Sequence, residues 1–157
     1  MRVGFGIDAH RFCPGQYVIL GGVRIAHEQA IEAHSDGDVL VHAICDALLG
    51  AAGLGDIGSH FSDQDASNKN RDSREFLRAT RVLIAEQGLA VVNIDSTLIL
   101  QKPKISPHKS AMQTNIAQDL QIDINQINVK ATTTEQMGFT GREEGIAATA
   151  IAALQTL

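Results

Sequence analysis

Apolar and polar side chains alternate with a period of two in several segments, which predicts β-strands. Arg2–His10 begins the chain in this way, and Gly21-Gly22 joins two short apolar runs as a hairpin, because glycine adopts positive φ readily. A later run is rich in β-branched residues, which favour strands. The predicted strands are residues 2–10, 17–20, 23–25, 90–101 and 127–134.

Apolar residues recur at helical spacing in three other segments. In the first of these, Leu40, Ile44 and Leu48 form a stripe along one side of the helix. In the second, we expect four residues to face the core, namely Phe76, Leu77, Val82 and Leu83. The predicted helices cover about residues 38–52, 73–87 and 106–119.

Residues that start or stop helices flank two of these segments. Asp72 or Ser73 is expected to cap the second helix, and Gly88 is expected to end it. Ser106-Pro107 predicts the start of the third helix, because serine is a good cap and proline fits the first helical position.

Glycine-rich and polar segments predict turns and loops. Gly53–Gly58 ends the first helix, and Phe61–Asn70 is too long and hydrophilic for a tight connection, which is typical of a mobile active-site loop. Gly138 and Gly141 indicate a turn near the end of the chain. Residues 144–156 are ambiguous from their pattern, because their alanines favour a helix whereas their β-branched residues allow a strand.

Composition limits the classes of protein to which the chain can belong. Its 157 residues are enough for one domain with its own core, and we expect a single catalytic domain over residues 1–157. The net charge of -5, without a cluster of Lys and Arg, argues against nucleic acid as a partner. Cys13 and Cys45 are far apart in sequence, so reduced thiols are expected.

The sequence also carries no recognisable targeting or membrane segment. No stretch approaches the roughly 18 apolar residues of a membrane span, and the N-terminus has neither a basic region nor an apolar signal core. We therefore expect no membrane partner, and a cytoplasmic protein or one in an organelle stroma after removal of a transit peptide.

Candidate metal ligands come from two predicted elements. Asp8 and His10 lie two residues apart in a strand, so both side chains point to one face, and His42 approaches from a helix. One carboxylate and two imidazoles suit Zn²⁺, and three protein ligands with an open fourth position are typical of catalytic zinc. The alternative is that Asp8 and His10 face solvent and that His42 is an ordinary hydrogen-bonded core residue.

Asp38 and Asp46 lie one helical turn before and after His42. An acid at this spacing can orient the ring of a metal-binding histidine by a hydrogen bond, although solvent-exposed aspartate is the more common arrangement. Both interpretations remain open from the sequence.

A series of motifs runs in order along essentially the whole chain. They are Asp8-Ala-His10, Ala33–Asp38 with His42, Gly55–Gly58, Phe61–Asp63, Asp72–Arg74, Gln101–Lys104, Val129–Glu135 and Gly138–Arg142. Together they resemble the 2-C-methyl-D-erythritol 2,4-cyclodiphosphate synthases of the non-mevalonate isoprenoid pathway. The resemblance implies an α/β (α+β) fold, in which a mixed sheet has helices packed on one face and residues 144–156 form a strand. It also implies a homotrimer with active sites between subunits.

The resemblance further implies ligands and roles for individual residues. Asp8, His10 and His42 would bind Zn²⁺, and Glu135 would bind Mg²⁺ or Mn²⁺. His34 and Thr133 would assist catalysis by hydrogen bonds in the transition state. The implied substrate contacts are Ser35, Asp56, Ile57, Gly58, Phe61, Asp63 and Asp65 around the erythritol diphosphate, Leu100, Pro103, Lys104, Ile105 and Ser106 around the cytidine, and Thr132 and Thr134.

The implied reaction is an intramolecular phosphoryl transfer. The 2-phosphate of 4-diphosphocytidyl-2-C-methyl-D-erythritol 2-phosphate attacks its own β-phosphate, expels CMP and closes a cyclic diphosphate. Since a phosphate nucleophile is largely ionised near neutral pH, catalysis reduces to positioning two anions and stabilising the developing charge.

The chain departs from the family pattern at two places. The resemblance suggests that Phe139 and Arg142 line a cavity on the trimer axis that can bind an isoprenoid diphosphate, but Ile7 stands beside it where the family often has an aromatic residue. In the cytidine segment, Lys102 and Ser106 stand where small or apolar residues are common. Recognition through backbone groups should tolerate the second difference.

Other interpretations remain open from the residues alone. Thr132–Thr134 can be plain strand residues, of which only alternate side chains would reach a ligand, and Arg142 can be a surface charge. Two other functions are a non-catalytic trimer that binds isoprenoid diphosphates and a zinc hydrolase of nucleoside diphosphates.

Overall fold

A computed structural model describes residues 1–157, and its centre is a five-stranded sheet in the order β4-β1-β7-β5-β6. The strands are β1 (Arg2–Pro14), β2 (Tyr17–Leu20), β3 (Val23–Ala26), β4 (Gln29–Ile31), β5 (Leu89–Ile99), β6 (Ile127–Thr132) and β7 (Gly145–Thr156). The helices are α1 (Val39–Ala52), α2 (Ile57–His60), α3 (Ser73–Glu86), α4 (Lys109–Leu120) and α5 (Gly138–Gly141), with 3₁₀ turns η1 (Ala66–Asn68), η2 (Ser106–His108) and η3 (Ile124–Gln126).

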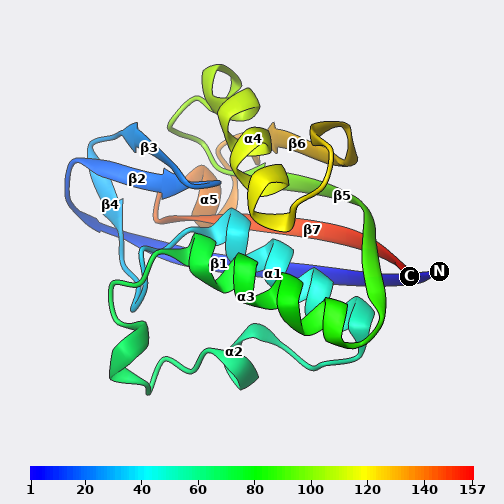
Figure 1. Ribbon diagram of the computed structural model, residues 1–157. Coiled ribbons are helices and arrows are strands. Elements are labelled where there is room, and N and C mark those ends of the chain that lie inside the picture. Colours follow the sequence, from blue (N-terminus) through cyan, green and yellow to red (C-terminus); the bar gives the residue numbers. More distant parts are fainter.

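The sheet is mixed, and its main helices lie on one face. β1 and β5 both pair with β7 in antiparallel fashion, whereas β6 runs parallel to β5. Figure 1 shows α1, α3 and α4 on the same side of this sheet, with the two termini close together at one end. The predicted fold class is therefore confirmed, as is the strand at the C-terminal end of the chain. β2 and β3 form a separate hairpin, also as predicted.

α1 packs unusually close to β1 because the strand presents glycine at the contact. A Cβ atom at Gly4 would lie 2.0 Å from the carbonyl oxygen of Ala47, and one at Gly6 would lie 2.0 Å from that of Ala43. β7 likewise turns small residues toward this helix, with Ala148 fully buried. The same alternation along β1 continues to Asp8 and His10, so these side chains also point to the helical face.

The predicted cap Asp72 is confirmed, and Asp38 is a further cap that was not predicted. Asp38 caps α1 by accepting from the Val41 N–H, and Asp72 caps α3 by accepting from the Arg74 N–H. The predicted cap at Ser106 is wrong, because residues 106–108 form the 3₁₀ turn η2, which has no side-chain cap, and α4 begins at Lys109.

The inward face of α3 differs from the prediction at its C-terminal end. Phe76 and Leu77 are buried as expected, but Val82 is exposed and Leu83 is only half-buried. Thr80 and Ile84 are buried instead, because they continue the i, i+4 row that starts at Phe76.

Other boundaries also differ from the predictions. β1 extends past His10 to Pro14, where it pairs with the short strand β4, which has too few residues to show a period. β6 ends at Thr132, so the predicted strand over residues 127–134 is two residues too long. The expected turn at Gly138 and Gly141 is the short helix α5, and the loop after α1 contains the one-turn helix α2.

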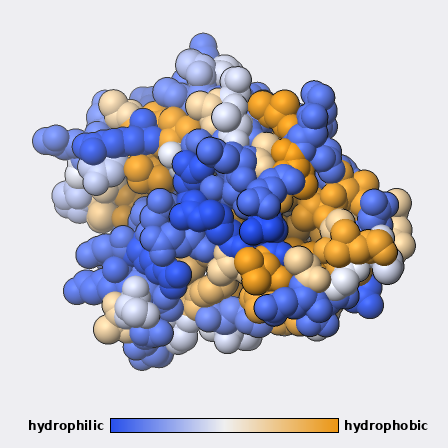
Figure 2. Space-filling model, viewed as in Figure 1, coloured by the Kyte–Doolittle hydropathy of each residue, from blue (hydrophilic) through white to orange (hydrophobic).

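The two faces of the sheet differ in character. On the helical side, Figure 2 shows mostly hydrophilic residues at the lower left and centre, and hydrophobic residues gather toward the right. The opposite face of β1 leaves Val3, Phe5 and Ile7 each more than half exposed. None of the helices has the length and apolar character needed to cross a membrane.

Candidate metal centre and neighbouring cavities

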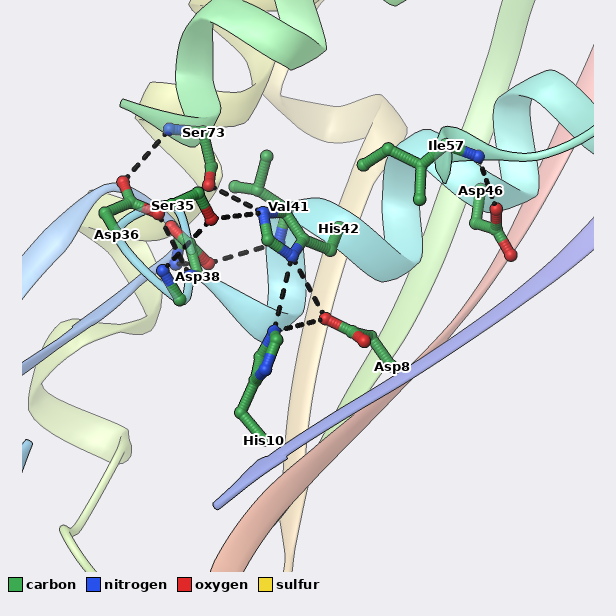
Figure 3. A network of polar contacts seen from close by, with 12 residues as sticks. Asp8, His10, Ser35, Asp36, Asp38, Val41, His42, Asp46, Ile57 and Ser73 are labelled. Atoms are coloured by element: carbon green, nitrogen blue, oxygen red, sulfur yellow. Dashed lines mark hydrogen bonds and ion pairs between the residues drawn. The ribbon is translucent and has the colours of Figure 1, made fainter. Parts of the chain in front are cut away.

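Asp8, His10 and His42 converge on one point above the helical face of the sheet (Figure 3). Oδ2 of Asp8 lies 2.9 Å from Nε2 of His10 and 3.1 Å from Nδ1 of His42, and the two imidazole nitrogens are 3.5 Å apart. Because β1 delivers two donors and α1 delivers the third, the close packing of Gly4 and Gly6 against α1 also determines this geometry.

The donor set fits a tetrahedral metal ion of the zinc type. Donor atoms that share such an ion at about 2.0–2.1 Å are about 3.3 Å apart, and the three observed separations lie on either side of this value. Two imidazoles with one carboxylate leave a fourth position for water or substrate. The three side chains are therefore arranged as candidate metal ligands.

The electrostatics of the three groups are coupled. Burial opposes ionisation of Asp8, but hydrogen bonds and charge from His10 and His42 outweigh it and lower the pKa of Asp8 from 3.8 to about 2. Burial likewise disfavours protonated His42, but Asp8 outweighs it and raises the pKa of His42. Without metal, the carboxylate is thus held in its charged form, which is the form that binds a cation.

This coupling predicts a pH-dependent contribution of Asp8 to stability. Since its folded-state pKa lies below the usual value, ionised Asp8 stabilises the metal-free protein above about pH 4, and the contribution disappears as the pH falls through about 2. We expect Asp8→Asn to lower the free energy of unfolding by about 2 kcal/mol near pH 5 and by less than about 1 kcal/mol near pH 2.

Urea unfolding of both chelator-treated proteins across this pH range measures the difference. The raised pKa of His42 keeps its contribution present below 6.5, so both charges of the pair are in place near pH 5. A stability difference that does not change between the two pH values would contradict the coupling.

His42 donates no hydrogen bond to Asp38 or Asp46, so the orienting role that the sequence left open for these acids is not found. Asp38 is fully buried and accepts from the N–H groups of Gly21, Gly22 and Val41, while Asp46 accepts from the Ile57 N–H. Burial and the nearby charge of Asp36 raise the pKa of Asp38 to about 6. Both acids therefore accept hydrogen bonds from backbone N–H groups, including those at the starts of α1 and α2.

A serine from another helix takes the position expected for an acid. Nε2 of His42 lies 2.7 Å from Oγ of Ser73 and 3.3 Å from Oγ of Ser35. Ser73 was predicted only as a helix cap, and its sequence distance from His42 gave no signal of this contact.

A cavity of about 150 Å³ opens beside the three candidate ligands. Six of the residues predicted to contact substrate or act in catalysis line it, namely His34, Ser35, Ile57, Gly58, Phe61 and Asp63. Asp56 and Asp65 do not line this cavity; Asp56 caps α2 at Ser59, and Asp65 accepts hydrogen bonds from Ser67. Asn68 and Phe76 line it without having been predicted.

A second and larger cavity, of about 400 Å³, lies at the ends of β5 and β6. Seven predicted residues line it, namely Leu100, Pro103, Lys104, Ile105, Ser106, Thr132 and Thr133. Thr134 instead bonds to Thr140, and Glu135 lies exposed in a loop with φ of 52°. The two cavities have no lining residue in common, so they are distinct cavities on one chain.

Phe139 and Arg142 lie near a third hollow, of about 250 Å³. Phe139 lines it together with His10 and Arg11, whereas Arg142 does not line it and pairs with Glu144 at 2.9 Å. Both predicted residues are exposed on a single chain.

The fold and site define an α/β protein with a candidate metal centre between a strand and a helix, next to polar cavities. The sequence pattern of the YgbB family matches residues 1–155. The chain therefore belongs to the YgbB family, as do its 2-C-methyl-D-erythritol 2,4-cyclodiphosphate synthase relatives, which confirms the predicted family.

Two relatives are similar over the whole chain. The 2-C-methyl-D-erythritol 2,4-cyclodiphosphate synthase of Pseudomonas putida (strain W619) is 58% identical over 154 residues, or 98% of both chains. The enzyme of that name from Azotobacter vinelandii is 58% identical over 157 residues, or 100% of both chains.

Solved structures have the same fold. The bifunctional IspDF from Campylobacter jejuni matches 99% of this chain with a TM-score of 0.96 and 46% identity, and this chain spans 42% of that longer protein. The CDP complex of IspF from Plasmodium falciparum matches 99% of this chain and 96% of its own, with a TM-score of 0.86 and 36% identity.

Proposed function

We propose that this protein converts 4-diphosphocytidyl-2-C-methyl-D-erythritol 2-phosphate to 2-C-methyl-D-erythritol 2,4-cyclodiphosphate and CMP, in the non-mevalonate pathway of isoprenoid synthesis. The convergence of Asp8, His10 and His42 beside a polar cavity carries the proposal, in a chain 58% identical to named synthases. Because the reaction cleaves a phosphorus–oxygen bond without water, the enzyme is a lyase of the cyclising kind.

The chain's residues have to hold two anionic groups in line and stabilise the charge that spreads in the transition state. No side chain needs to deprotonate the attacking phosphate, which is largely ionised near neutral pH. We propose that His34 and Thr133 donate hydrogen bonds to phosphate oxygens, each worth about 2 to 4 kcal/mol by comparison with oxyanion-hole donors. Their positions in the walls of the two cavities support these roles.

We propose Zn²⁺ for the site of Asp8, His10 and His42, since two imidazoles and a carboxylate are donors that zinc prefers. When bound there, zinc supplies a Lewis acid that polarises a phosphate oxygen. We propose Glu135 as the protein ligand of Mg²⁺ or Mn²⁺, which such enzymes hold through one or two carboxylates together with substrate phosphates. The exposed position of Glu135, next to the cavity-lining Thr133, supports this assignment.

The substrate is proposed to extend across both cavities. The residues proposed for the erythritol diphosphate are Ser35, Asp56, Ile57, Gly58, Phe61, Asp63 and Asp65, and those proposed for the cytidine and its phosphates are Leu100, Pro103, Lys104, Ile105, Ser106, Thr132 and Thr134. The second cavity is the larger of the two, and the solved Plasmodium falciparum relative carries CDP. Both observations support a nucleotide in the second cavity.

We propose a homotrimer in which a neighbouring subunit completes each active site. Two observations support this assembly. The cavity of Thr133 and that of His42 share no residue on one chain, and the sheet face opposite the helices exposes the apolar side chains of Val3, Phe5 and Ile7. A cavity for an isoprenoid diphosphate at Phe139 and Arg142, on the trimer axis, is proposed with it.

The test is incubation of the purified protein with the cytidine diphosphate substrate and Mg²⁺, followed by mass analysis of the products. The cyclic diphosphate together with CMP is the expected result. Linear products would favour a zinc hydrolase, and tight binding of a prenyl diphosphate without turnover would favour the binding trimer. Either outcome would overturn the proposed cyclisation.

Glu135→Gln is expected to raise the Mg²⁺ concentration needed for half-maximal activity by about tenfold or more, because the divalent cation loses a charged ligand. Titration of activity with Mg²⁺ measures the change. Glu86→Gln is the matched control, since Glu86 is also exposed but lies at the far end of α3. An unchanged titration curve for Glu135→Gln would remove this residue from the metal site.

A further inference from the structure

His42 presents its two ring nitrogens to different partners (Figure 3). Nδ1 lies 3.1 Å from Oδ2 of Asp8, on the side of the other two candidate ligands, and Nε2 lies 2.7 Å from Oγ of Ser73. An ion shared with Asp8 and His10 would take the lone pair of Nδ1. The ring proton then resides on Nε2, which donates it to the Ser73 hydroxyl oxygen.

Ser73 can accept this hydrogen bond because its own proton has another acceptor. The Ser73 hydroxyl is in close contact with Oδ1 of Asp36. The same carboxylate accepts from the N–H of Ser73 and from that of Asp38, each at 3.0 Å. Since an ionised carboxylate only accepts, the hydrogen bonds run in one direction, from His42 to Ser73 to Asp36.

These three residues join the starts of two helices. Ser73 is the first residue of α3 and is fully buried, while His42 lies in the first turn of α1. Asp36 belongs to the loop before α1 and bonds to the backbone of α3. The Asp36 carboxylate therefore cannot move away from the Ser73 hydroxyl without breaking its hydrogen bonds to the backbone N–H groups of Ser73 and Asp38.

Ser35 is a weaker partner of the same nitrogen. Its Oγ lies 3.3 Å from Nε2 of His42, which is longer than the 2.7 Å contact of Ser73. Ser35 Oγ accepts from the Gly37 N–H at 3.3 Å and has no carboxylate behind it, and Ser35 lines the cavity beside the candidate ligands. Ser73 is thus the stronger hydrogen-bond partner of the His42 ring.

We propose that Ser73 and Asp36 are positioning residues of the metal centre. By fixing the ring plane of His42 and the proton on its Nε2, they direct Nδ1 toward the ion and increase the affinity of the site. This inference rests on the proposed metal site. Loss of such an outer hydrogen-bond partner typically weakens metal binding by about 10- to 100-fold.

Zinc affinities of the full-length protein and its variants test the proposal, measured by competition with a chromogenic chelator. Ser73→Ala and Asp36→Asn are each expected to raise the dissociation constant by about 10- to 100-fold. Ser96→Ala is the matched control, because its hydroxyl is equally buried and donates to the Asn128 carbonyl within the sheet. We expect its zinc affinity to match the wild type.

A second readout separates ring orientation from a general loss of structure. In ¹⁵N-histidine spectra of the zinc-loaded protein, the Nε2 proton of His42 is expected to exchange slowly with solvent. Ser73→Ala should speed this exchange, whereas Ser96→Ala should leave it unchanged. Thermal unfolding checks that each variant is folded. If Ser73→Ala does not fold, Asp36→Asn takes its place in the test.

The two proposals fail in different ways. Zinc affinity within about twofold of the wild type in Ser73→Ala, with an unchanged exchange rate, would overturn the positioning role and leave the metal site standing. Wild-type protein that binds no zinc would overturn the metal site itself, and the positioning role with it.

Discussion

His42→Ala is expected to abolish zinc binding and turnover while the protein stays folded. The variant loses one of three candidate ligands. Its zinc affinity should therefore fall by more than about 100-fold, which is the largest loss typical when a residue hydrogen-bonded to a metal ligand is removed. Loss of charge stabilisation at the phosphates should lower kcat by at least about 10²- to 10³-fold, the cost of one oxyanion-hole donor. The fold should survive because Leu40, Ile44 and Leu48 anchor α1 in the core.

Zinc content, product formation and circular dichroism together measure this outcome. His27→Ala is the matched control, since this half-buried imidazole packs on Phe12 at 5.2 Å and makes no contact with the candidate ligands. It should keep both zinc and activity. Full activity in His42→Ala would count decisively against the site, and an unfolded His42→Ala would assign this side chain a structural role.

Gly6→Ala is expected to cause a large loss of stability, because it adds a methyl group where β1 packs directly against the backbone of α1. The new Cβ would lie 2.0 Å from the Ala43 carbonyl oxygen and 2.7 Å from the Ala47 nitrogen, both backbone atoms of α1. Because no flexible side chain can yield, β1 and α1 must separate. The free energy of unfolding should fall by about 3 kcal/mol or more, at the upper end for overpacking.

The same separation should damage the metal centre. Asp8 lies two residues beyond Gly6 on the same face of β1, and His42 lies beside Ala43 on α1, so a wider gap moves the donors apart. Gly6→Ala should therefore also weaken zinc binding. Urea unfolding of the metal-free protein and a zinc titration measure the two effects independently.

Gly50→Ala supplies the control within the same helix. Apart from the backbone of its own helix, nothing lies within 4 Å of a Cβ added at Gly50, and alanine favours the helix interior by up to about 1 kcal/mol over glycine. This variant should equal or exceed the wild type in stability and bind zinc normally. If Gly6→Ala were as stable as Gly50→Ala, the close contact of β1 with α1 would not be what aligns the ligands.

The agreement between sequence and structure is best where a feature depends on neighbours along the chain. The period of two in β1 predicted that Asp8 and His10 share a face, and Asp72 caps α3 as predicted. Ser106 was misassigned because it is the first residue of the 3₁₀ turn η2, which has no side-chain cap, and α4 begins three residues later at Lys109. The third helix was thus predicted with the wrong start.

The partners of the imidazole show where local pattern is insufficient. Helical spacing brought Asp38 and Asp46 to within one turn of His42, yet both bond to backbone N–H groups of other segments. Ser73, 31 residues away along the chain, is the side chain that contacts Nε2. Which group reaches the ring depends on how α3 docks against α1, and no spacing within α1 contains that information.

The sequence by itself determined most of the longer elements, the cap of α3, the family and the residue types able to bind a metal, because these depend on short-range periodicity and on side-chain chemistry. Only the tertiary structure decided that the three donors lie within 4.8 Å of one another, that Ser73 and Asp36 stand behind His42, and that the two cavities are separate. The physical reason is that packing between β1, α1 and α3 sets these distances, and packing depends on the shapes of residues distant in sequence.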